Sequence, residues 1–210
     1  MKNLSWLVIL CLCLSTGEAQ KIVEKHIPMS PGKSVVMNLE IADSIRVITW
    51  SKNEVYAKAS ININDNKDNE YYATTFDETS SNINIKAKLD FPKLKRDCNC
   101  NCETVIYWDV YIPENTGFSV ESINGNITII GNPAEIRAHT ISGFIDLTIP
   151  ATRKADFKFS TISGTVYSNL AINTGGDGHS STSFSDRFNG GGKRIDLETI
   201  SGDIFLRKSE

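Results

Sequence analysis

The segment His139–Pro150 reads HTISGFIDLTIP, and the four residues Thr-Ile-Ser-Gly near its start occur three times in the chain. These copies span Thr140–Gly143, Thr161–Gly164 and Thr199–Gly202, and a looser copy, Ser-Ile-Asn-Gly, spans Ser122–Gly125. The intervals between their glycines are 18, 21 and 38 residues, so the last is close to two of the shorter ones. One short unit that recurs in this way predicts a repeated structural element, with room for one irregular turn in the longest interval.

Apolar residues alternate with polar residues on both sides of each glycine. The positions seven and five residues before it, and two and four residues after it, are apolar in every copy except at Ser168. Such an alternation with a period of two is typical of two strands joined by a corner. Because one unit of this kind cannot enclose a core alone, the copies are expected to stack on one another. Residues 118–210 are therefore predicted to form a β-solenoid or β-roll.

The repeated tetrapeptide is interpreted as the corner of each unit. A glycine there allows a positive φ or a close approach of neighbouring units, and the hydroxyl and amide side chains before it can bond the corner backbone. The predicted corner glycines are Gly125, Gly143, Gly164 and Gly202. The isoleucine of each tetrapeptide is expected to face the core. These isoleucines are Ile123, Ile141, Ile162 and Ile200.

Residues 1–19, MKNLSWLVILCLCLSTGEA, are expected to be a cleaved secretory signal peptide. Lys2 precedes an apolar run, Leu4 to Leu14, and small residues follow it near Ala19. The run is too short to cross a bilayer as a helix, and no segment after it is long and apolar enough to do so. The mature chain is therefore expected to be exported, either to the periplasm, to the cell surface or into the medium.

The mature chain, residues 20–210, is predicted to be one all-β domain. Its first part, residues 20–117, is β-rich but irregular and continues into the repeated part, residues 118–210. Alternation in the first part predicts strands at Val35–Leu39, Ile45–Trp50, Val55–Ile63, Ile83–Leu89 and Thr104–Ile112. Asp65–Glu78 is the candidate for a short helix. The Gly- and Ser-rich stretch near residues 169–194 predicts a long loop or a degenerate repeat.

Composition and charge bound the functions that the chain can have. The 210 residues are 40% hydrophobic, which is enough for a real core. The formal net charge is −3, so there is no basic excess to neutralise phosphates. These values argue against a dedicated nucleic-acid binder.

Four passages together are characteristic in their order. They are the repeated TISG, the turn WSKNEV at Trp50–Val55, the passage VYIPENTGFSVESINGNITI at Val110–Ile129 and the run NGGGKRIDLETISGDIFLRK at Asn189–Lys208. In these passages the chain, from about Val35 to Lys208, resembles the bacterial putative-adhesin family of the cell envelope. The resemblance implies a right-handed β-helix or β-roll fold and an exported location. It brings no catalytic residues and no cofactor to this chain.

The cysteine cluster DCNCNCE at Asp97–Glu103 is a candidate metal site. In an extended segment, Cys98, Cys100 and Cys102 would line one face about 7 Å apart. Zinc needs sulfurs at about 2.3 Å and a fourth ligand, which is missing nearby. The alternative is an exposed loop with free thiols or one redox-sensitive pair. No cofactor is otherwise expected.

Three aromatic residues form the candidate binding surface. The strand after each corner places Phe144, Tyr167 and Phe205 on its outward side. On neighbouring units they could form a stacking surface for a sugar or line a groove for a protein. The alternative is that the stretch near residues 169–194, or the N-terminal part, covers them.

Asp196, Glu198 and Asp203 form the one acidic group around a corner. They could hold calcium weakly or serve as the acids of an enzyme, and ordinary surface charge is the alternative interpretation. An enzyme would need these carboxylates to converge in a cleft. A binding surface would instead show them spread over a flat or convex face.

The favoured function is a non-catalytic cell-envelope protein that presents an extended β-solenoid surface for binding or adhesion. Stacked repeats build long surfaces rather than one deep pocket. The expected partner is an envelope glycan or another envelope protein. The alternatives are a polysaccharide-acting enzyme of β-helix type and a structural or assembly partner of another envelope protein.

Overall fold

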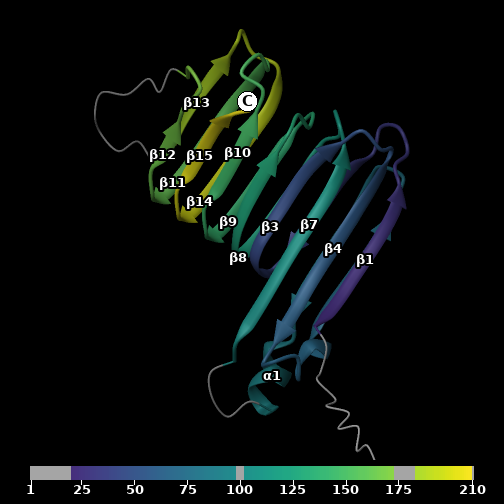
Figure 1. Ribbon diagram of the computed structural model, residues 1–210. Helices are drawn as coiled ribbons and strands as arrows, with labels where there is room; N and C mark the ends of the chain where they lie inside the picture. Colours follow the sequence, from purple (N-terminus) through teal and green to yellow (C-terminus); the bar gives the residue numbers. More distant parts are fainter. Residues whose placement is uncertain (1–19, 98–101, 173–182, 210) are drawn as a thin grey trace, which may run out of the picture.

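The computed structural model of the protein describes residues 20–97, 102–172 and 183–209. The fold is all-β with almost no helix (Figure 1). The first strands are β1 (Lys21–Pro28), β2 (Ser34–Leu39), β3 (Ile41–Trp50), β4 (Glu54–Ile63), β5 (Tyr72–Glu78), β6 (Asn82–Leu89) and β7 (Thr104–Pro113). The later strands are β8 (Phe118–Ile130), β9 (Ile136–Ser142), β10 (Ile145–Ile149), β11 (Ala155–Ser163), β12 (Val166–Ser168), β13 (Ser183–Phe188), β14 (Lys193–Ser201) and β15 (Ile204–Lys208). None of the helices in the described ranges is long and apolar enough to cross a membrane.

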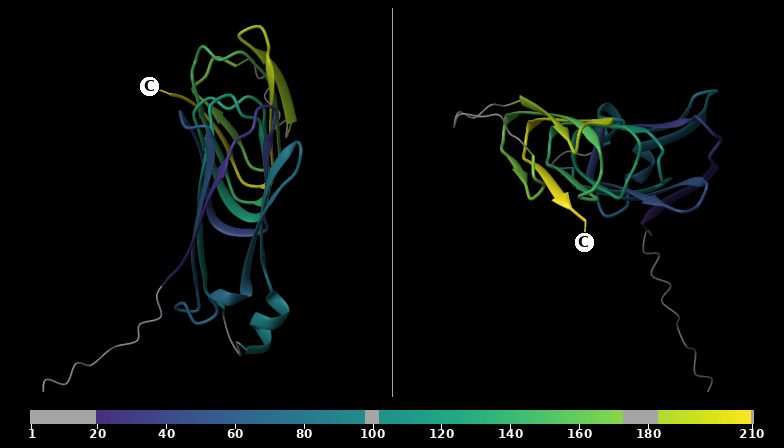
Figure 2. Two further views of the ribbon diagram at one scale, coloured as in Figure 1. Left: turned by 90° about the vertical axis from the view of Figure 1, so that its right-hand side faces the viewer. Right: turned by 90° about the horizontal axis from the view of Figure 1, so that it is seen from above.

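The strands form one open sheet that folds over into two layers (Figures 1 and 2). In layer A the strand order is β1-β4-β7-β3-β8-β10-β15-β12, and in layer B it is β5-β6-β2-β8-β9-β14-β11-β13. The long strand β8 belongs to both layers, because its first half pairs with β2 and β9 and its second half with β3 and β10. The apolar side chains between the layers form one continuous core.

The register of the parallel strands confirms the predicted columns of apolar residues. In layer B one column runs through Val35, Phe118, Ile136, Ile195 and Phe157. In layer A another column runs through Ile45, Ile127, Ile145, Ile204 and Val166. The strands β2 and β3 thus supply a fifth unit, which the repeat did not reveal because its corner carries no glycine. All five predicted strands of the first part are confirmed within a few residues at their ends.

The units do not stack in chain order. Strand β14 pairs with β9 on one side and with β11 on the other, so the last unit in the sequence lies inside the stack. The described part of the interval before it contains no degenerate repeat. Instead, β13 pairs antiparallel with β11 at the edge of layer B, where Phe188 stacks on Phe157 and Phe184 contacts Phe159. These rings cover the end of the core that a further unit would otherwise cover.

The corners explain the repeated glycine and threonine. A Cβ on Gly143, on Gly202 or on Gly164 would overlap the backbone carbonyl oxygen of the corner glycine in the adjacent unit. The threonine of the tetrapeptide is buried and donates its hydroxyl to that same carbonyl. The three bonds run from Thr140 to Gly125 (3.1 Å), from Thr199 to Gly143 (3.0 Å) and from Thr161 to Gly202 (2.9 Å). Both predicted roles, close approach by glycine and backbone bonding by hydroxyls, are therefore confirmed.

The prediction that the isoleucine of each tetrapeptide faces the core is wrong. Ile123, Ile141, Ile162 and Ile200 are 36 to 68% exposed. In a strand, residues seven, five and three positions before the glycine share one face, and this face is the buried one. The threonine occupies the third of these positions, so the isoleucine that follows it points outward.

The helix expected at Asp65–Glu78 is also wrong. The segment begins with a turn in which Asn64, Asp65 and Asn66 have positive φ, followed by one turn of 3₁₀ helix at Asn69–Tyr71 and by β5. The buried side chain of Asn69 accepts a hydrogen bond from the backbone N–H of Ile63 at 2.8 Å, which closes this turn. Asparagine and aspartate tolerate positive φ, which favours a turn over a helix. A short α-helix, α1 (Phe91–Asp97), lies elsewhere, after β6.

Candidate functional site

The three aromatic residues of the candidate binding surface come together on the outer face of layer A. Tyr167 of β12 pairs in register with Phe205 of β15, and their rings stack at 5.3 Å with planes 11° apart. Phe144, just before β10, packs edge-on against Phe205 at 6.0 Å. We call these three residues the aromatic ladder. The structure brings them into contact, and their role in binding stays a prediction.

The aromatic ladder is open to solvent on its outer side. The side chain of Tyr167 is 50% exposed, and the other two rings are half-buried. Within the described residues of the stretch near residues 169–194, β13 does not cover them, since it pairs with β11 in the other layer, and Asn169 lines a hollow beside them. A hollow of about 240 Å³ lies between Tyr167, Phe205 and Arg207. Of the N-terminal strands, β1 and β4 lie at the far end of layer A, and β3 is separated from β10 by β8 (Figure 1).

Ion pairs surround the aromatic residues on this face. Arg207 packs over the ring of Phe205 at 5.3 Å and donates to both carboxylate oxygens of Asp146 at 2.9 Å. Closer to the edge strand β1, Lys58 pairs with Glu24 at 3.2 Å. The hydrogen bond and the charge of Glu24 raise the pKa of Lys58 above its usual value. The charged side chains of this face thus satisfy one another.

A second group of aromatic side chains lies on the same face and was missed in the sequence. His26, Trp50, Tyr56 and Tyr111, which we call the Trp50 cluster, extend from β1 across β4 and β7 to β3. Each ring lies 4.5 to 6.2 Å from a neighbouring ring. Burial among these neighbours, and then the charge of Glu24, raise the pKa of Tyr56. The alternation of the strands could have revealed the outward position of each ring, but not which strands are adjacent.

The acidic residues proposed for catalysis or calcium do not converge. Asp196 lies on the outer face of layer B and pairs with Arg194 at 2.6 Å. Asp203 lies at the start of β15 in layer A and accepts a hydrogen bond from the backbone N–H of Thr165 at 2.8 Å. Glu198 is exposed on β14. Among the described residues no three His, Cys, Asp or Glu side chains are placed to hold a metal ion.

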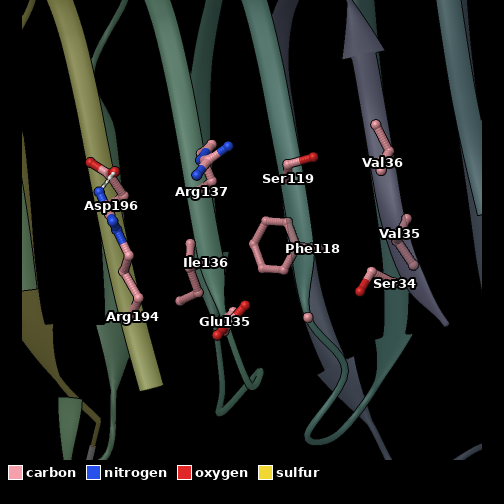
Figure 3. A pocket seen from close by; sticks show the side chains of 11 residues that line it. Ser34, Val35, Val36, Phe118, Ser119, Glu135, Ile136, Arg137, Arg194 and Asp196 are labelled. Atoms are coloured by element: carbon pink, nitrogen blue, oxygen red, sulfur yellow. Dashed lines mark hydrogen bonds and ion pairs between the residues drawn. The ribbon is translucent and has the colours of Figure 1, made fainter. Parts of the chain in front are cut away.

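An open hollow of about 220 Å³ lies beside Asp196 on layer B (Figure 3). It extends over β2, β8, β9 and β14, and its charged lining residues are Glu135, Arg137, Arg194 and Asp196. The hollow thus holds two carboxylates, Glu135 and Asp196, and that of Asp196 is already paired with Arg194 at 2.6 Å.

The cysteine cluster lies mostly outside the described residues. Cys98 and Cys100 belong to that undescribed stretch, whereas Cys102 packs partly against the core before β7. The possibility of a metal or redox site there stays a prediction.

The fold is that of an open, folded all-β sheet, and it is shared with a solved structure. The crystal structure of a putative cell adhesion protein from Clostridium sporogenes ATCC 15579 aligns with a TM-score of 0.60 and 12% identity, over 91% of this chain and all of that one. A putative adhesin from Bacteroides fragilis NCTC 9343 aligns over 90% of this chain and 98% of its own, at 7% identity, but its TM-score of 0.29 carries no argument. No family model and no curated protein matches the sequence. The likeness thus concerns the fold.

Proposed function

We propose that the protein is a non-catalytic, exported binding protein of the cell envelope, which presents the outer face of layer A to an envelope component. Residues 1–19 serve as its signal peptide in this proposal. Its stacked units are proposed to form a β-solenoid-like array of the putative-adhesin type. The passages that resemble this family support the proposal, and so does the fold shared with the Clostridium sporogenes protein.

The observation that carries the proposal is the aromatic ladder. Three aromatic side chains from adjacent strands lie in contact on an open sheet face, and Tyr167 is half exposed. Exposed aromatic groups of this kind mark contact sites more often than isolated surface residues do. A face that extends over several stacked strands suits an extended partner.

The position of the acidic residues supports a function without catalysis. The carboxylates of Asp196 and Asp203 face different sides of the molecule and already have partners. A glycoside hydrolase of the usual type would need two carboxyl groups to flank one bond of its substrate. The spread arrangement is the one expected of a binding surface.

The proposal is tested by comparing envelope fractions captured by the wild-type protein and by the F144A/Y167A/F205A variant. Tyr107→Ala serves as the matched control, because Tyr107 lies on the same outer face, is 47% exposed and contacts neither aromatic group. We expect the triple variant to lose captured material that wild type and control retain. Identical profiles for all three would overturn the proposal. Because the triple variant could lose stability, Tyr167→Ala alone, at the edge strand, is measured as well, with circular dichroism of each variant.

A further inference from the structure

The Trp50 cluster is an aromatic surface that no function yet uses. His26 stacks on Tyr56 at 4.5 Å, and Trp50 lies 5.2 Å from Tyr111. The ammonium group of Lys52 lies over the Trp50 ring at 4.7 Å. Valine, alanine and isoleucine residues between these positions are fully buried, so the rings stand on the outer face of layer A.

A row of side chains, apolar as far as Ile130, connects the Trp50 cluster to the aromatic ladder. Tyr111 pairs in register with Ile48, and Ile48 pairs with Ile130, which is 38% exposed. Ile130 in turn pairs with Thr148, and Thr148 pairs with Arg207, the residue that packs on Phe205. The two aromatic groups therefore lie on one continuous surface that runs across the strands.

The charges along this surface compensate one another. Four carboxylates and their cationic partners lie beside the row, each within an ion pair. The pairs are Glu24 with Lys58, Asp109 with Arg46, Asp146 with Arg207, and Glu54 with Lys52; the imidazole of His26 also lies 3.3 Å from Glu54. A charged ligand would have to break these pairs to gain a counter-charge, whereas an uncharged ligand keeps them. The paired groups still offer donors and acceptors to hydroxyl groups.

We propose that the outer face of layer A binds an uncharged glycan of several sugar residues, which lies across the strands with the Trp50 cluster and the aromatic ladder as its two contact sites. A sugar ring combines an apolar C–H face with a rim of hydroxyl groups, and this combination matches aromatic rings flanked by paired polar groups. From β7 to β15 there are four strand steps, or roughly 19 Å, which requires an oligomeric ligand. The inference rests on the proposed function and names the ligand class for it.

Isothermal titration calorimetry with defined sugars tests this inference. The probes are cello-, xylo- and maltohexaose and hexa-N-acetylchitohexaose, the disaccharides of the same series, and an anionic hexagalacturonate. The variants are Tyr111→Thr in the Trp50 cluster and Tyr167→Thr in the aromatic ladder, since threonine preserves strand propensity. Tyr107→Thr is the control, because Tyr107 lies on β7 like Tyr111 but outside both groups.

We expect at least one uncharged hexamer to bind, its disaccharide to bind at least tenfold more weakly, and each single variant to lose about tenfold in affinity because one of two linked contacts is removed. The affinity should be unchanged between 50 and 500 mM salt, roughly a threefold change in screening length. Failure of every uncharged hexamer to bind, or a preference for the anionic probe, overturns the inference. If Tyr167→Thr weakens binding and Tyr111→Thr does not, the Trp50 cluster is refuted as a contact site and the proposed function stands. If no sugar binds but envelope capture still depends on Tyr167, the glycan is refuted and the proposed function again stands.

Discussion

Replacing Gly202 by alanine tests the physical role of the repeated corner. Gly202 lies inside the stack, between the corners of Gly143 and Gly164. A Cβ on Gly202 would lie 2.1 Å from the carbonyl oxygen of Gly143. Real Cβ atoms essentially never approach another heavy atom to less than 3.0 Å. The position of the Cβ is fixed by the backbone of residue 202, and the Gly143 carbonyl is itself part of the backbone. Neither atom can therefore move away by a side-chain rotation. The two units must separate locally.

The cost of this separation follows from the bonds at the corner. The units are linked there by the hydrogen bond from the Thr199 hydroxyl to the Gly143 carbonyl at 3.0 Å and by that from the Gly143 N–H to the Ser201 carbonyl at 3.1 Å. Overpacking a tight site costs about 1 to 3 kcal/mol, and leaving a buried carbonyl without its donor costs about 1 to 3 kcal/mol more. We expect Gly202→Ala to lose about 2 to 6 kcal/mol, with a fall in Tm of roughly 4 to 24 °C.

Urea unfolding followed by circular dichroism measures this loss, and two glycines provide matched controls. At Gly117 a Cβ would meet the nearest atom, Ser34 Oγ, at an ordinary 3.4 Å, so Gly117→Ala should be neutral or stabilising by up to about 1 kcal/mol. At Gly125 a Cβ would meet the Ala42 carbonyl at 2.8 Å, so Gly125→Ala should fall between the two. Equal stabilities of the Gly117 and Gly202 variants, or a larger loss at Gly125 than at Gly202, would refute the reasoning.

Three further substitutions have defined outcomes. Thr199→Val keeps the shape of a buried side chain but removes the donor to Gly143, so urea unfolding should show a loss of about 1 to 3 kcal/mol; an unchanged midpoint would contradict this. Burial raises the pKa of Tyr72 to about 12. The unfolded chain therefore releases this proton near pH 10 while the folded chain keeps it, and stability is lost as the pH rises from 10 to 12. At neutral pH the free energy of unfolding of wild type exceeds that of Tyr72→Phe, in part because the Trp108 indole donates a hydrogen bond to the Tyr72 hydroxyl at 3.0 Å. This difference should shrink by about 3 kcal/mol between pH 10 and pH 12. A difference that stays constant over this range would contradict the prediction. Ile162→Thr should change stability by less than about 0.5 kcal/mol, because Ile162 is 68% exposed, and a loss typical of a core residue would restore the inward interpretation.

The strands and the apolar columns could be predicted because both depend on local alternation. A period of two around a glycine specifies which residues face the core, whatever lies on the other side of it. The same rule, applied without a break up to the corner, places Thr140 inward and Ile141 outward. The prediction that the isoleucine of each tetrapeptide faces the core relied on its hydrophobic side chain and not on its position in the alternation. Residue identity alone misleads at such corners, because a buried hydroxyl with a backbone partner is satisfied there.

The candidate binding surface could be predicted only in part. The outward positions of Phe144, Tyr167 and Phe205 follow from alternation, and their contact requires that β10, β15 and β12 be adjacent, as they are. The Trp50 cluster was missed because its four residues come from strands whose order in the sheet differs from their order in the sequence. Their proximity depends on the pairing of β1 with β4, of β4 with β7 and of β7 with β3.

The sequence by itself determined the unit: two strands, a corner that needs glycine, and a threonine that satisfies the neighbouring carbonyl. These properties are local, so each copy carries them independently. Only the tertiary structure decided the order of the units, because copies with the same apolar columns and the same corner can each pair with any other. The placement of β14 between β9 and β11, and the cover of the end by Phe184 and Phe188, depend on non-local packing. The same non-local pairing brings the two aromatic groups onto one face, where the proposed function lies.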